Sequence, residues 1–115
     1  MNEAPTELKN NIIDTLENHK AHDITFIDVS HMTQICDYMI IVTATSSRHL
    51  KNLSEKTETT VKQHTGHSPR VEGDQNTDWI IVDALDIVVH IMLQSAREFY
   101  QLESLWDFDE EITEH

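Results

Sequence analysis

Apolar residues recur along the chain with two spacings, one typical of helices and one typical of strands. Helical spacing covers residues 5–19, 46–64 and 96–106. Strand-like segments cover residues 24–29, 38–44, 69–73, 78–83 and 86–93. The pattern predicts an α/β (α+β) fold in the order α-β-β-α-β-β-β-α, with a mixed sheet of about five strands and helices packed on it.

Several local signals set the expected ends of these elements. Ser46 or Ser47 can cap the second helix with its hydroxyl, and Gly66 can end it. Ser95 is expected to cap the last helix. The near-continuous apolar character of residues 38–44 indicates a central strand covered on both faces. The helix between residues 38–44 and 69–73 predicts a crossover, and the last three strands predict a meander.

Residues 78–93 contain the densest apolar run and are interpreted as an antiparallel hairpin. A turn centred on Ala84 and Leu85 would pair Asp83 with Asp86, and it would place Trp79 opposite His90. Alternation along the strands leaves one purely aliphatic face, which we expect beneath helices. The other face is mixed and carries Trp79, Ile81, Asp83, Asp86, Val88, His90 and Met92.

This mixed face fits neither a core nor a plain solvent surface. Buried faces rarely hold two carboxylates and an imidazole, and solvent faces rarely hold so many large apolar side chains. An aromatic residue among aliphatics, with a charged rim, suits a protein-binding surface. We therefore expect these residues to bind a partner, with Trp79 as the main contact and its N–H free at the rim. The alternative is that another helix or strand covers the face.

Charge narrows the choice of partner. With Lys and Arg numbering 8 and Asp and Glu 21, the net charge is −13 with histidine neutral. Phosphates of nucleic acid would be repelled, which disfavours direct, sequence-specific nucleic-acid binding, whereas a basic protein would be attracted. The four basic residues on the second helix are interspersed with Glu55 and Glu58, so this surface is expected to be solvated.

Other features bear on the compartment and the domain organisation. Cys36 is the only cysteine, so no intrachain disulfide can form and a reducing compartment is favoured. No apolar run approaches the roughly 20 residues of a membrane span, and no signal-peptide pattern is present at the start. We expect a cytoplasmic protein without membrane association. A single domain is expected over residues 1–106, followed by a partly disordered acidic tail over residues 107–115.

Sites for chemistry are weakly indicated. The histidines at 64 and 67, the pair Asp83 and Asp86, and His90 could ligate a metal, but no third ligand accompanies any pair in sequence. Asp83 and Asp86 could share acid and base roles, although hairpin carboxylates are more often turn residues. Residues 43–47 lack glycine, which favours a helix cap over a phosphate loop. We expect no catalytic residues, no metal and no cofactor.

Six ordered sequence blocks resemble the ribosomal silencing factor family, also called Iojap-like. They are DYMII at 37–41, TSSRH at 45–49, VEG at 71–73, DWIIVD at 78–83, DIVVH at 86–90 and REFYQLESLW at 97–106. The resemblance implies a homodimer-prone domain of nucleotidyltransferase-like topology without catalysis. It also implies binding to the universal fourteenth protein of the large ribosomal subunit, which blocks joining of the small subunit and represses translation when nutrients are limiting.

One residue departs from the family pattern, since Leu85 stands where the family usually has glycine before the aspartate that opens the last strand. A turn that needs positive φ there would be strained by leucine. Two further hypotheses stay open beside the ribosomal one. The first is a small nucleotidyltransferase-like enzyme using Asp83, Asp86 and Glu72, and the second is a dimeric adaptor without ribosome contact.

Overall fold

A computed structural model of the chain describes residues 4–34, 36–74 and 76–101. The elements are α1 (Ala4–Asn18), β1 (His22–Asp28), β2 (Tyr38–Ala44), α2 (Ser47–Thr65), β3 (Arg70–Glu72), β4 (Trp79–Asp83), β5 (Ile87–Leu93) and α3 (Gln94–Tyr100). Their order confirms the predicted α-β-β-α-β-β-β-α pattern. The expected tail and residues 102–106 of the last predicted helix lie outside the described residues.

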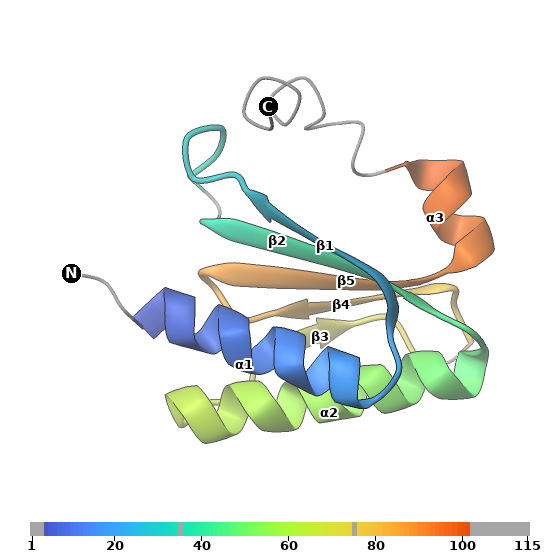
Figure 1. Ribbon diagram of the computed structural model, residues 1–115, viewed down its shortest axis with the longest axis horizontal. Helices are drawn as coiled ribbons and strands as arrows, with labels where there is room; N and C mark the ends of the chain where they lie inside the picture. The colour runs from blue at the N-terminus through green and yellow to red at the C-terminus, as the bar shows by residue number, and fades with distance from the viewer. Residues whose placement is uncertain (1–3, 35, 75, 102–115) are drawn as a thin grey trace.

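The strands form one mixed sheet in the order β1-β2-β5-β4-β3 (Figure 1). β2 and β5 run parallel at its centre, and the remaining pairs are antiparallel. α2 crosses over from β2 to β3 at the sheet edge, after which β3, β4 and β5 form the predicted meander. The central position of β2, buried from Ile40 to Ala44, agrees with its near-continuous apolar sequence.

α1 and α2 lie together on one face of the sheet (Figure 1) and enclose the larger part of the core. Alternate residues of the central strands point into this part of the core, which confirms that the aliphatic face of the hairpin lies beneath helices. The buried members are Leu8, Ile12, Leu16, Ile40, Val42, Ala44, Leu50, Leu53, Val61, Ile80, Val82, Ile87, Val89 and Ile91. We call the opposite face of the sheet the second face. Among the described residues, α3 and the loop that follows β1 lie on it.

α2 begins and ends as its sequence predicts. Ser46 is the N-cap, and its Oγ accepts a hydrogen bond from the His49 N–H at 3.1 Å. Gly66 closes the helix at φ 82°, a left-handed conformation in which glycine carries no Cβ penalty. Thr45 donates its backbone N–H to His49 Nδ1 at 2.9 Å, so residues 43–47 serve as a cap.

The hairpin register differs from the prediction by two residues. Asp83 pairs with Val88, Ile81 with His90 and Trp79 with Met92, because β5 begins at Ile87 and the two turn residues are Leu85 and Asp86. A shift of two keeps every side chain on its predicted face, since strand alternation has a period of two. The division into an aliphatic and a mixed face therefore holds.

α3 also differs from the prediction at both ends. It begins at Gln94, and its N-cap residue Leu93 makes no side-chain capping bond, so Ser95 is not the cap. It ends at Tyr100, because Gln101 adopts a left-handed conformation at φ 48° and closes the helix with its N–H on the Arg97 carbonyl. Within the described residues α3 is thus a short helix attached directly to the end of β5.

Candidate protein-binding face

The second face of the sheet carries the side chains that alternation assigns to it. Ile41 and Met92 form a small buried cluster there with Ala96 of α3, and Met39, Trp79 and Val88 pack against its margin. α3 lies over one end of this face, away from the layer made by α1 and α2 (Figure 1). Much of the face between α3 and the β4–β5 turn is left partly exposed, including the side chains of Met39, Ile81, Asp83 and Val88.

The seven residues predicted to bind a partner are at different depths. Trp79, Ile81, Asp83 and Val88 are partly exposed, and Asp86 is exposed in the turn. Met92 is fully buried and His90 is 8% exposed. Because their side chains are covered, Met92 and His90 support the face from beneath and are not positioned to contact a partner directly. This corrects their expected role.

Trp79 also differs from the expectation. Its Nε1–H donates to Nδ1 of His90 at 3.0 Å, so the indole N–H is used inside the protein and is not free at a rim. The indole ring lies 4.8 Å from the Tyr100 ring of α3, centroid to centroid. Trp79 is therefore a link between the sheet and α3 as well as part of the surface.

The same hydrogen bond fixes the state of His90. Nδ1 can accept from the indole only when it carries no proton, which places the proton of the neutral ring on Nε2. Burial disfavours the charged imidazolium and lowers the pKa of His90 to about 4. His90 is thus a neutral, structural histidine at physiological pH.

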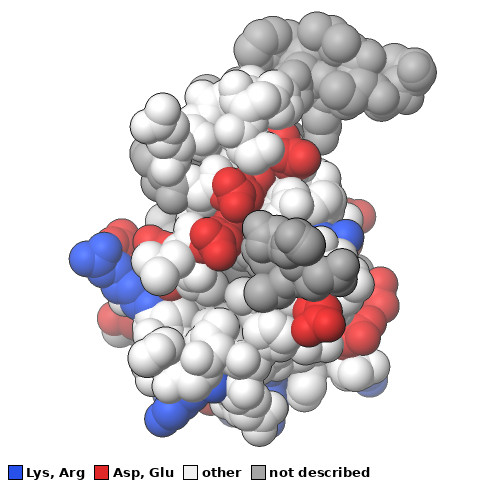
Figure 2. Space-filling view, turned by 90° about the vertical axis from the view of Figure 1, so that its left-hand side faces the viewer, with Lys and Arg blue, Asp and Glu red and all other residues white. Residues whose placement is uncertain are grey.

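Carboxylates gather at the end of the second face opposite α3, where the β4–β5 turn lies. Asp37, Asp83 and Asp86 all lie near Cys36, and we call these three aspartates the acidic end. Seen from that side, acidic side chains cross the middle of the surface while basic ones lie toward its margins (Figure 2). A concentration of negative charge beside exposed aliphatic residues is complementary to a basic protein surface.

The acidic end shows no arrangement for catalysis. Asp83 Oδ1 accepts the Leu85 backbone N–H at 2.9 Å, so this carboxylate stabilises its own turn. Burial, and then the nearby carboxylates, raise the pKa of the Cys36 thiol, so it stays protonated at neutral pH and is a poor nucleophile. Glu72 lies on β3 opposite Ile81. Within the described residues, no group of three potential ligands could hold a metal ion, and His64 Nδ1 accepts from the Asn11 amide at 3.1 Å.

The basic residues of α2 lie away from the second face. Arg48, Lys51, Lys56 and Lys62 are exposed, and Lys51 pairs with Glu55 at 3.9 Å along the helix. Ion pairs of this exposed kind contribute little stability. The mixed, solvated character predicted for this helix surface is confirmed.

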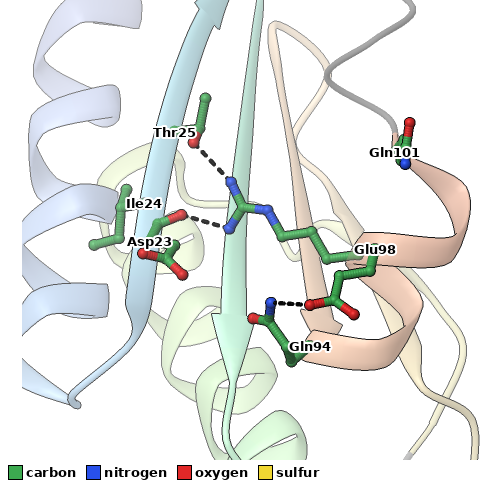
Figure 3. A pocket seen from close by; sticks show the side chains of 7 residues that line it. Asp23, Ile24, Thr25, Gln94, Glu98 and Gln101 are labelled. Carbon is green, nitrogen blue, oxygen red and sulfur yellow. Dashed lines mark hydrogen bonds between the residues drawn. The ribbon is translucent and has the colours of Figure 1, made fainter.

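Sequence reasoning missed the contribution of α3 to the second face. Phe99 and Tyr100 are exposed there at 79% and 47%. Arg97 fixes the helix by donating to Thr25 Oγ1 at 2.7 Å and to the Asp23 carbonyl, across an open groove beside β1 (Figure 3). It also donates to Thr43 Oγ1 of β2 at 2.9 Å. Helical spacing over residues 96–106 predicts a longer amphipathic helix with Phe99 on its apolar stripe, so nothing in the sequence indicated that Phe99 would be exposed beside Tyr100.

Comparisons with known proteins converge on one family. Residues 2–115 match the family described as "Ribosomal silencing factor during starvation". Ribosomal silencing factor RsfS of Haemophilus influenzae is 41% identical over 83% of this chain and 93% of that protein. Its counterpart in Zymomonas mobilis is 34% identical over 93% of this chain and 80% of that protein.

More distant relatives and solved structures agree with this result. A mouse protein named "Mitochondrial assembly of ribosomal large subunit protein 1" is 32% identical over 90% of this chain and 48% of its own length. The crystal structure of a Chromobacterium violaceum protein superposes with a TM-score of 0.84 and 34% identity, covering 89% of this chain and 85% of that one. The sheet and helix arrangement described above is therefore shared with solved relatives.

Proposed function

Because this chain belongs to the ribosomal silencing factor family, we propose that it binds the large ribosomal subunit through the second face of its sheet and prevents the small subunit from joining. The proposed contact is a basic protein, the universal fourteenth protein of the large subunit. The consequence is repression of translation under nutrient limitation. The name of the mouse relative, which refers to the large subunit, supports this choice of subunit.

One structural observation supports the location of the contact. The partly exposed aliphatic strip of Met39, Ile81 and Val88 borders the acidic end and is not covered by α1 or α2. An apolar centre with a charged border is the usual anatomy of a protein interface. The acidic border also favours a basic protein over the RNA that surrounds it on a ribosome.

Further parts of the proposal follow from the family. We expect action as a binding protein without catalysis, self-association as a homodimer, and a location in the cytoplasm where ribosomes are found. Among the described residues, none of the helices combines the length and the apolar character that a bilayer span requires.

Sedimentation with purified ribosomal subunits tests the proposal. The chain should pellet with free large subunits and not with small ones, and it should lower the fraction of joined ribosomes when both subunits are present. Binding to both subunits equally, or to neither, would contradict the proposal.

A pair of matched variants tests the location of the contact. Ile81→Ala removes a partly exposed side chain from the second face and should weaken binding by roughly fivefold to thirtyfold, since truncating an interface residue of this kind costs about 1 to 2 kcal/mol. Ile24→Ala makes the same change at a partly exposed position of β1 that packs on the opposite side, against the α1 and α2 layer. If Ile81→Ala and Ile24→Ala bind large subunits with the same affinity, the contact does not lie on the second face.

A further inference from the structure

Aromatic rings form a continuous series from the buried sheet to the surface of α3. The centroids of His90 and Trp79 are 5.7 Å apart, those of Trp79 and Tyr100 are 4.8 Å apart, and those of Tyr100 and Phe99 are 4.9 Å apart with the last pair edge-on. Exposure rises along the series, from 8% at His90 to 79% at Phe99. The outermost ring thus packs edge-on against Tyr100 while most of the surface of Phe99 faces water.

Phe99 contributes little to the fold that holds it. A ring that is 79% exposed buries little apolar area, so its removal should change folding stability only slightly. The position of α3 depends instead on buried Ala96 and on the Arg97 guanidinium, which joins the helix to β1 and β2. A seven-residue helix is not stable by itself, so these contacts are what keep Phe99 in place.

We infer that Phe99, Tyr100 and Trp79 form an aromatic anchor that packs against an apolar patch of the basic partner protein, while the acidic end binds basic side chains of that same protein. This inference rests on the proposed function and adds α3 to its site. Aromatic residues that are already ordered before binding lose little conformational freedom, which makes them effective interface contacts.

The two ends also constrain the partner. Trp79 and Asp83 stand at opposite ends of the five-residue strand β4, four residue steps apart, and at about 3.3 Å per step they are separated by about 13 Å. The partner surface should therefore present an apolar patch and a basic patch at about this spacing. Such a surface can dock in one orientation only, since the reverse orientation would place basic side chains on Phe99.

The test compares Phe99→Ala with Phe99→Tyr in sedimentation with purified large subunits. The alanine variant should bind at least tenfold more weakly with an unchanged circular dichroism spectrum and melting temperature, and the tyrosine variant should bind as the unaltered chain does because it keeps the ring. Phe26→Ala is the matched control, since Phe26 is 36% exposed on the opposite side of the sheet, beneath the Lys9 ammonium. It should bind normally.

The possible outcomes separate the anchor from the proposed function. If the unaltered chain does not bind large subunits, the proposed function fails and the anchor fails with it. If the unaltered chain binds and Phe99→Ala binds equally well, only the anchor is overturned. A third outcome is that Phe99→Ala keeps subunit binding and instead changes the sedimentation coefficient of the protein alone, which would assign the aromatic rings to contact between two copies.

Discussion

His90 shows how a polar residue can belong to an apolar sheet face. It is buried beside Met92, and its Nδ1 is occupied by the indole N–H of Trp79. A buried imidazole satisfied in this way stabilises the fold only in its neutral form, because protonation would add a buried charge and turn the acceptor into a donor facing another donor. The residue is therefore sensitive to acid.

We predict that His90 makes the protein less stable as pH falls from 6.5 to 4. Its folded-state pKa of about 4 lies below the unfolded value of 6.5, so in this window the unfolded chain binds more protons and stability rises with pH. The full difference is about 3 kcal/mol, and almost no change from this group is expected above about pH 7.5, where the unfolded histidine is also neutral. Urea unfolding at several pH values measures it.

The control for this prediction is His90→Gln, which cannot ionise and still offers an acceptor to Trp79. Its stability should fall less between pH 6.5 and 4, because the contribution of His90 is then absent. Parallel pH profiles for the two proteins would show that His90 does not titrate in this window.

Residue depth could not be predicted from the sequence for the second face. Alternation correctly assigned Trp79, Ile81 and Met92 to one face, because the period of a strand is fixed by its geometry. It could not show that α3 covers Met92 while leaving Ile81 partly exposed, since this depends on where a distant helix docks. The use of the Trp79 N–H likewise depends on the diagonal position of His90, which the predicted register missed.

At the scale of elements, the β4–β5 hairpin is where the sequence prediction and the structure differ most clearly. Leu85 adopts φ 74° and is 78% exposed, held by the bond from its N–H to Asp83. A left-handed conformation costs a residue with a Cβ about 1 kcal/mol, and leucine is unusual there. The strain expected from the departure at Leu85 is thus present, in a turn made of Leu85 and Asp86.

We predict that Leu85→Gly stabilises the protein by up to about 0.5 kcal/mol, since the relief of about 1 kcal/mol of left-handed strain exceeds the roughly 0.5 kcal/mol that glycine costs by freeing the unfolded chain, and the leucine side chain buries little. The neighbouring Ala84→Gly is the control. Ala84 has no positive φ, so glycine there should destabilise by a similar amount through greater freedom of the unfolded chain. Thermal unfolding of both variants measures the effect, and a loss of stability in Leu85→Gly would mean that the leucine makes a contact that its exposure does not suggest.

α2 and α3 illustrate why some elements are easier to predict than others. The limits of α2 are marked in the sequence by Ser46 and Gly66, whose capping roles are local and follow from their own chemistry. α3 has no comparable marker, because Leu93 caps it without a side-chain bond and Gln101 ends it by a conformation that the residue type does not favour. Its position is set by Arg97 reaching residues more than fifty positions earlier in the chain.

At the scale of the whole molecule, both long helices cover the same side of the sheet. Among the described residues, this arrangement leaves the second face to the short helix α3 and the loop that follows β1, and it places the aromatic anchor and the acidic end at opposite ends of one surface. The overall charge of −13 strengthens the negative electrostatic potential around the acidic end, because few basic groups are available to neutralise it. Long-range electrostatics should therefore affect how the domain approaches a ribosome.

Two electrostatic effects oppose each other in that approach. Ribosomal RNA repels an acidic domain, and a basic ribosomal protein attracts it. Salt screens both, but groups in direct contact lie well within the Debye length of about 10 Å at 0.1 M, whereas most of the RNA lies beyond it. Attraction at the contact should consequently dominate the dependence on salt.

We predict that affinity for large subunits falls by about tenfold when monovalent salt rises from about 0.05 M to about 0.5 M at constant magnesium. The double variant Asp83→Asn with Asp86→Asn removes two charges from the acidic end and should show a shallower dependence, whereas Phe99→Ala should weaken binding by the same factor at every salt concentration because its contact is apolar. Affinity that rises with salt would show instead that repulsion by RNA controls binding, and the acidic end would then have to face away from the ribosome.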